Sequence, residues 1–267
     1  MNNKIKESKI TNNNELKQYL ICKAQNHNSY KYYASREKIE TIIKNGCIYL
    51  SNGNNWNDII DRSNFNSPNA KYQNFGLCLS YSKSENIAMW MLYSGNEGLM
   101  INYDKAIITH ILSTQKILLG YFDKNDHTFK CRQELKKPNF EIFIIDMLYH
   151  GEYLKEETCY VKRSDEINKK FDAKLIANAT YYVKALPWSY ENECRIVVSI
   201  PRELIEDSCI SDVAINLPYE ISAKLPKNVY ESPNVANIAY NPSAMSNKMS
   251  WKLYLDCPNC KHRSKKT

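Results

Sequence analysis

The chain of 267 residues is long enough for one large domain with a sizeable core, and its 43% hydrophobic and 24% charged residues are typical of globular proteins. Only 7 glycines occur, without a GxGxxG or GxxxxGK[ST] motif, which argues against a glycine-rich loop that holds nucleotide phosphates. The net charge of +7 is modestly basic, and the tail from Lys261 to Lys266 supplies much of it, so nucleic acid is only weakly indicated as a partner.

The predicted elements alternate between short strands and helices along the chain. The helices are expected over residues 14–21, 36–44, 84–93, 104–112, 139–148 and 167–177, with Ser84 as the cap of the third. The strands are expected over residues 29–34, 47–50, 75–82, 98–103, 117–122, 195–198, 213–217, 237–240 and 250–255. Such interleaving predicts the α+β class. We expect a polar tail with a short helix over 1–28, a single domain over 29–240, and a C-terminal strand with a basic tail over 241–267.

The N-terminal residues are polar and show no signal peptide. No apolar run approaches the roughly 20 residues that a membrane-spanning helix needs. We therefore expect a cytoplasmic protein that does not span a membrane.

The stretch Ala185–Ile200 concentrates residues that can carry chemistry. A proline-marked break with two aromatic residues precedes Glu191 and Glu193, and an apolar β-branched run that begins at Arg195 predicts a buried strand. Alternate residues of a strand share a face, so both glutamates are expected to point the same way, with Glu191 the more exposed. They form either a pair of acid–base or charge-stabilising groups, or two solvated charges beside Arg195.

Four stretches, in this order, resemble the bacterial family labelled domain of unknown function 2971 over residues 29–240. They are Tyr30-Lys31-Tyr32-Tyr33, then Asn45–Ser51 with Trp56-Asn57-Asp58, then Leu79–Ser82 with Met89-Trp90, Tyr93 and Gly98-Leu99, and finally Trp188–Arg195. That family is similar to the ADP-ribosyltransferase superfamily. The resemblance implies split, mostly antiparallel sheets with flanking helices and a cleft that holds NAD.

The resemblance also implies roles for particular residues. The Glu-x-Glu motif of such enzymes falls on Glu191 and Glu193, the second of which would stabilise a ribose oxocarbenium ion while the first accepts a proton from the acceptor. The Ser-x-Ser motif falls on Ser80 and Ser82, which would bind the ribose or Glu193, or else mark the start of a helix without any ligand. The usual Arg or His of the first strand is replaced here by Lys31 or Tyr32.

The resemblance implies further contacts with the cofactor, and each residue concerned has a structural interpretation as well. Lys31 would neutralise a pyrophosphate or is a solvated lysine, and Tyr32, Tyr81 and Tyr93 would stack on NAD or belong to the core. Arg195 either orients Glu193 or forms a structural ion pair. Trp90 is expected in the core, and Asn57-Asp58 either organise a turn, which is the favoured interpretation, or belong to the rim of the cleft.

The implied function is NAD consumption, with ADP-ribose passed to a protein, a nucleic acid, a small molecule or water, and the resemblance also implies a role as a toxin or phage-defence effector. The alternative is a non-catalytic module that binds a nucleotide or nucleic acid, which the lysine at position 31 and the basic tail favour.

A metal site is not expected. Cys257, Cys260 and His262 resemble half of a zinc knuckle, but zinc needs four ligands and no second pair of ligands is nearby.

Overall fold

The computed structural model describes residues 10–82, 86–95, 97–123, 125–153, 158–162, 169–172 and 181–231. The predictions for Ser84, for the strands over 237–240 and 250–255, and for Cys257, Cys260 and His262 lie outside the described residues.

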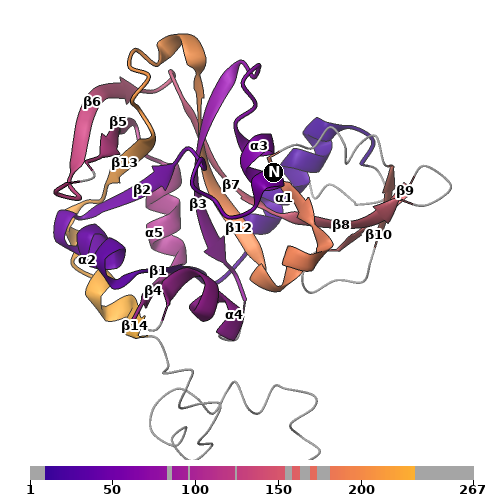
Figure 1. The fold of residues 1–267 in the computed structure, drawn as a ribbon, viewed down its shortest axis with the longest axis horizontal. Coiled ribbons are helices and arrows are strands. Elements are labelled where there is room, and N and C mark those ends of the chain that lie inside the picture. Colours follow the sequence, from indigo (N-terminus) through magenta and orange to yellow (C-terminus); the bar gives the residue numbers. More distant parts are fainter. Residues whose placement is uncertain are drawn as a thin grey trace, which may run out of the picture.

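Two sheets and several helices make up the described part of the chain (Figure 1). The larger sheet contains β1 (Tyr30–Ala34), β2 (Cys47–Ser51), β3 (Tyr72–Ser80), β4 (Leu99–Tyr103), β5 (Lys116–Phe122), β6 (Phe129–Lys136), β7 (Glu141–Asp146), β12 (Glu193–Pro201), β13 (Asp212–Asn216) and β14 (Val229–Glu231). The smaller sheet contains β8 (Leu148–Tyr153), β9 (Thr158–Lys162), β10 (Lys169–Asp172) and β11 (Val183–Ala185). In Figure 1, β8, β9 and β10 project from one side of the larger sheet.

The helices and helical turns are α1 (Asn13–Ala24), α2 (Arg36–Asn45), α3 (Ile59–Phe65), α4 (Ile87–Met89), η2 (Trp90–Ser94), α5 (Lys105–Leu112), η3 (Leu186–Glu191), η4 (Arg202–Leu204), α7 (Tyr219–Ser222) and η5 (Leu225–Asn228). Strand pairs in the larger sheet are antiparallel, whereas β11 runs parallel to β8. The α+β class and the mostly antiparallel sheet are therefore confirmed.

The larger sheet divides at β3. One edge of β3 pairs with β12 along nine residues, from Ser80 opposite Glu193 to Tyr72 opposite Pro201. The other edge meets two strands, β1 at Ser80 and β2 at Gly76. Strand β1 pairs in turn with β4, and β2 pairs with β13, so the sheet separates into two branches beyond β3. Ser80 lies where the β1 branch joins.

Hydrophobic residues cover both faces of the strands β3, β12 and β7. The side chains of Cys194, Ile196 and Val198 enter the main core, which α2 and α5 also line. On the other face, Val197 and Ile145 enter a second core, which α1 covers with its buried residues Leu16, Tyr19 and Leu20. Helix α1 thus packs against β7 as part of the same body.

Local signals for α2 are confirmed. The helix ends at Gly46, whose φ of 61° is the left-handed conformation that glycine adopts without a steric penalty. The amphipathic spacing places Ile39 and Ile42 in the main core.

Two helix predictions are wrong. Residues 139–148 contain strand β7 instead. Ile142 and Ile144 pack against one core, and Phe143 and Ile145 pack against the other. The run is therefore apolar on both faces, and its pattern resembles that of a buried helix. Residues 169–172, within the predicted helix 167–177, form β10.

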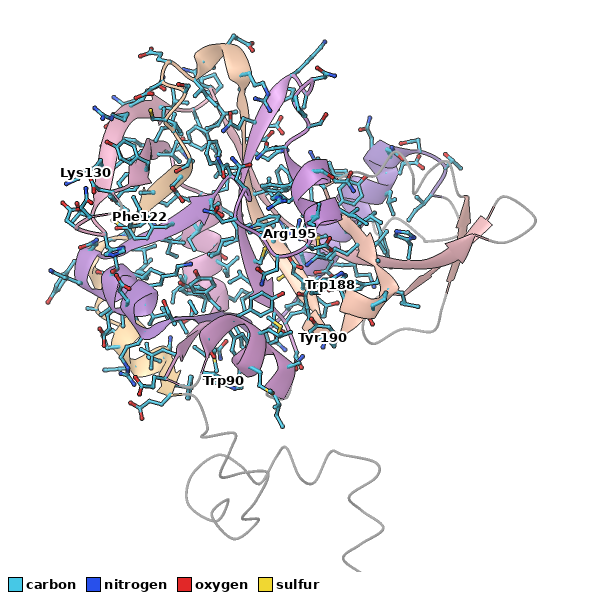
Figure 2. The ribbon with its side chains drawn as sticks, viewed as in Figure 1. Trp90, Phe122, Lys130, Trp188, Tyr190 and Arg195 are labelled. Carbon is cyan, nitrogen blue, oxygen red and sulfur yellow. The ribbon has the colours of Figure 1, made fainter. Side chains whose placement is uncertain are left out.

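The helix predicted over 84–93 is confirmed in part: a short α4 capped by Asn86 is followed by the π-helical turn η2. Trp90, which is labelled in Figure 2, is fully buried, as expected.

Candidate active site

Three polar side chains form a row across neighbouring strands. Lys31 of β1 lies opposite Ser80 of β3, and Ser80 lies opposite Glu193 of β12. Residues directly opposite each other in antiparallel strands project to the same face. The sequence motifs that suggested a binding site therefore meet on one face of the sheet, at the point where the sheet divides.

Glu191 and Glu193 do not lie on one extended segment, contrary to expectation. Glu191 ends the 3-10 turn η3, and Asn192 adopts a left-handed conformation with φ of 46°. The hydroxyl of Ser80 donates to the carbonyl of Glu191 at 2.7 Å, and the backbone N–H of Glu193 donates to the hydroxyl of Tyr149 at 2.8 Å. These contacts hold the turn to the sheet.

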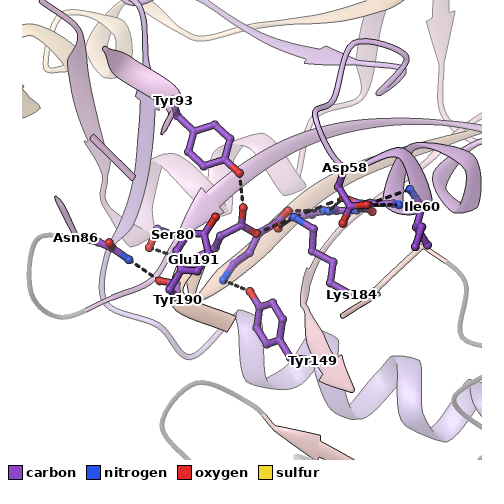
Figure 3. A network of polar contacts seen from close by, with 12 residues as sticks. Asp58, Ile60, Ser80, Asn86, Tyr93, Tyr149, Lys184, Tyr190 and Glu191 are labelled. Carbon is purple, nitrogen blue, oxygen red and sulfur yellow. Dashed lines mark hydrogen bonds and ion pairs between the residues drawn. The ribbon is translucent and has the colours of Figure 1, made fainter. Parts of the chain in front are cut away.

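The two carboxylates converge on the ammonium of Lys184 (Figure 3). Its Nζ donates at 2.7 Å to Oε2 of Glu191 and at 2.7 Å to Oε2 of Glu193. The same Nζ lies 3.5 Å from Oδ2 of Asp61. Lys184 belongs to β11 of the smaller sheet, so the site forms where the two sheets meet.

Arg195 completes the cluster from the next position on this face of β12. Its Nη1 donates to Oδ1 of Asp61 at 2.8 Å, its Nη2 donates to Oδ2, and its Nε donates to Oε1 of Glu193. The guanidinium lies 4.5 Å from the ring centroid of Trp56, which favours a cation–π contact. The expectation that Arg195 contacts Glu193 is confirmed.

Asp58 places Asp61 within reach of Arg195. The carboxylate of Asp58 accepts from the N–H groups of Ile60 and Asp61 at 3.0 and 3.2 Å and caps α3. The expected turn-organising role of Asp58 is therefore confirmed.

We call Asp61, Lys184, Glu191, Glu193 and Arg195 the charge cluster. Its members are nearly inaccessible: Glu191 is 1% exposed, Glu193 3% and Arg195 0%. The prediction that Glu191 is the more exposed glutamate is wrong, because η3 folds it under Tyr93 and beside Lys184. Three carboxylates and two cations leave one excess negative charge if all are ionised, and burying an uncompensated charge is costly.

The two glutamates have different proton affinities. Burial, and then the neighbouring charge of Glu193, raise the pKa of Glu191 to about 7. Burial also opposes ionisation of Glu193, but Arg195 and Lys184 outweigh it and hold the pKa of Glu193 well below its usual value. One proton on Glu191 makes the cluster neutral.

Tyr93 covers Glu191 from the π-helical turn. Its hydroxyl donates to Oε1 of Glu191, and burial, followed by that carboxylate, raises the pKa of Tyr93 well above its usual value. The side-chain amide of Asn86 donates to the carbonyl of Tyr190 and ties the turn to η3. π-Helical turns are rare and often occur at functional sites.

Other predicted contacts are distributed differently. The Nζ of Lys31, which is buried, donates to the carbonyl of Ser82 at 2.9 Å. Tyr32 packs against the main core, on the opposite face of β1 from Lys31. Tyr81 is buried and stacks on His27 at 3.8 Å between ring centroids. The structure therefore brings Lys31, Ser80 and Tyr93 to the face or turn around the glutamates, and does not bring Tyr32 and Tyr81 there.

Sequence reasoning missed Lys184 and Asp61. Lys184 follows Tyr181-Tyr182-Val183 and precedes Ala185-Leu186, and a single lysine inside an apolar run is a signal that it is buried with a partner. Asp61 carried no such signal, since it lies three residues from another aspartate in a polar loop region.

Residues 89–196 match the family described as protein of unknown function (DUF2971). This match supports the DUF2971 family that the motifs indicated, and it includes Tyr93, Lys184 and the Glu-x-Glu motif. It leaves out Lys31, Asp61 and Ser80. No curated protein and no solved structure matches the chain.

Among the described residues, no helix is long and apolar enough to cross a membrane. The same residues also contain no group of three or more His, Cys, Asp or Glu side chains placed to hold a metal ion.

Proposed function

We propose that the charge cluster is the active site of an NAD-consuming enzyme of ADP-ribosyltransferase type. The observation that carries the proposal is the pairing of a carboxylate kept ionised with a carboxyl group that titrates near neutrality, 2.7 Å from the same ammonium. Groups whose environments separate their pKa values in this way divide acid–base and electrostatic roles between them.

Glu193 suits the electrostatic role. When the bond between ribose C1′ and nicotinamide nitrogen breaks, the electron pair leaves with nicotinamide and the ribose becomes an oxocarbenium ion. A fixed carboxylate stabilises that cation more than it stabilises the neutral ribose, and this difference lowers the barrier. Contacts with Arg195 and Lys184 occupy one site on each oxygen of Glu193, and a carboxylate accepts about four hydrogen bonds in total, so acceptor capacity for a ribose hydroxyl is left.

Glu191 suits the proton-transfer role. The acceptor, which is water or a hydroxyl, amino or thiol group, attacks C1′ and must lose a proton. A base with a pKa of about 7 is half ionised at neutral pH and takes that proton efficiently. Lys31, on the same face, would face the pyrophosphate as a point charge.

NAD turnover by the purified protein tests the proposal. Free nicotinamide is measured by chromatography, and transfer is followed with NAD labelled in its adenylate half, in the presence of cell extract. We expect nicotinamide release by the wild type and a loss of about 10²-fold or more in Glu193→Gln, because the substitution removes a charge that acts in the transition state.

Glu203→Gln is the matched control, because Glu203 is exposed on η4 and the chemical change is the same. It should retain wild-type turnover. A wild type that leaves NAD intact and labels nothing in the extract refutes the proposed activity.

The near-complete burial of Glu191 and Glu193 favours a second candidate, a non-catalytic module that binds a nucleotide or nucleic acid beside a structural charge network. Calorimetry separates the two. Binding of NAD or of RNA that survives Glu193→Gln, without nicotinamide release by the wild type, supports the module, and salt-dependent affinity identifies nucleic acid.

A further inference from the structure

We propose that Lys184 is the positioning residue that holds Glu191 and Glu193 on one ammonium, while their separate partners, Tyr93 and Arg195, make the two glutamates chemically different. The catalytic meaning of this role rests on the proposed function, whereas the separation of the two carboxyl groups does not.

The geometry requires a shared cation. Two ionised carboxylates that approach a common point repel each other, and Lys184 Nζ lies 2.7 Å from an oxygen of each (Figure 3). Lys184 is 7% exposed, and its Nζ lies 5.4 Å from the ring centroid of Trp188. Its backbone is fixed opposite Tyr149 in the parallel pairing of β11 with β8. The ammonium is therefore held from the smaller sheet while both glutamates approach from the η3–β12 segment.

The two glutamates differ in their remaining partner. Glu193 also contacts the guanidinium of Arg195, whereas the other oxygen of Glu191 accepts from the uncharged phenol of Tyr93. Two cations, Lys184 and Arg195, therefore favour the ionised form of Glu193, whereas Lys184 alone favours the ionised form of Glu191. The excess proton of the cluster goes to Glu191, as its pKa of about 7 indicates. Lys184 limits this effect, since it lowers the pKa of Glu191 that burial raises.

The surrounding titratable groups come from several elements, and they are Asp61 on α3, Cys78 on β3, Tyr93 on η2, Tyr149 on β8, Tyr190 on η3 and Arg195 on β12. Burial raises the pKa values of the thiol and of the three phenols, so these groups stay neutral near pH 7. Burial opposes the charged forms of Lys184 and Arg195, but the carboxylates of Glu193 and Asp61 outweigh it and raise both pKa values, so both cations stay charged. Near neutral pH, a titration of the Glu191–Glu193 pair therefore reports the protonation of Glu191.

Carboxyl NMR on protein labelled with ¹³Cδ-glutamate tests the proposal without any need for turnover. Glu191→Gln and Glu193→Gln assign the two signals. In the wild type we expect Glu191 to titrate near pH 7 and Glu193 to remain ionised down to pH 5. Lys184→Met keeps the length of the side chain and removes its charge, and it should raise the midpoint of Glu191 by about one pH unit or more. Lys184→Arg should keep the midpoint nearer to the wild-type value.

Lys17→Met is the matched control, because Lys17 lies over the ring of Phe143 in the second core and outside the charge cluster. It should leave both midpoints unchanged. The proposal is overturned if Lys184→Met leaves the midpoint of Glu191 in place, or if the wild-type glutamates titrate together at the usual value for glutamate.

Should Lys184→Met fail to fold, Lys184→Gln, which also removes the charge, takes its place in the same titration, and the same two outcomes decide. Separated midpoints without NAD turnover would refute the proposed function and leave the role of Lys184 standing. NAD turnover with midpoints that do not separate would support the proposed function and refute the role of Lys184.

Discussion

Replacement of Glu191 by glutamine should change how the stability of the protein depends on pH. The folded state holds the proton of Glu191 up to about pH 7, whereas the unfolded chain releases it near pH 4.5. Below pH 4.5 both states are protonated and the stability associated with this proton is fully present. Between pH 4.5 and 7 only the folded state keeps the proton, so the free energy of unfolding falls as the pH rises.

The size of the effect follows from the separation of the two pKa values. A shift of one pKa unit corresponds to about 1.4 kcal/mol, so the shift from 4.5 to about 7 corresponds to about 3 kcal/mol at most. Glutamine stays neutral and cannot show this decline. The stability of Glu191→Gln relative to the wild type should therefore increase by about 3 kcal/mol between pH 4.5 and pH 8 and level off above about pH 7.

Urea denaturation at a series of pH values measures this difference, provided that the denaturant slopes of the two proteins agree. Other titrating groups are common to both proteins and largely cancel. Glu203→Gln, an exposed glutamate, serves as the control and should differ from the wild type by a nearly constant amount. A difference between Glu191→Gln and the wild type that stays constant from pH 4.5 to pH 8 would refute the assignment of a buried proton to Glu191.

Three further predictions concern activity and packing. If NAD is consumed, kcat/KM should rise with pH around a midpoint near 7 as Glu191 ionises, and this limb should be missing from the residual activity of Glu191→Gln; a flat wild-type profile would contradict the base role. Arg195→Met should cost about 3–5 kcal/mol in chemical denaturation, because it leaves the buried carboxylates of Asp61 and Glu193 with Lys184 as their shared cation, and a loss below about 1 kcal/mol would contradict this account. Gly76→Ala should lower the melting temperature, with a cost of about 1–3 kcal/mol, because the new Cβ would lie 2.8 Å from the ring of Phe65; an unchanged melting temperature would show that the ring moves freely.

The sequence predicted the elements whose signals are local. Helix α2 has an apolar side and a glycine at its end, and the run after Glu193 has the β-branched composition of a buried strand, so both were identified within a few residues. The motifs around Ser80 and Glu193 were also singled out, and the register of β3 with β12 places them opposite each other.

The sequence misled where two environments produce the same pattern. Strand β7 is apolar on both faces, and a buried helix has the same composition over so short a run. Tyr81 lies beside Ser80 in the sequence but projects to the other face of the sheet, where it stacks on His27. A one-residue step along a strand reverses the face, so closeness in sequence says little about which side chains share a site.

Local sequence determined where strands and turns form, because backbone conformation depends on neighbouring residues. Only the tertiary structure decided which charges meet. Lys184 comes from the smaller sheet and Asp61 from a helix more than 100 residues earlier, and they join Glu191 and Glu193 because two sheets pack together. The protonation state of each glutamate depends on that long-range arrangement, since burial and neighbouring charges set its pKa.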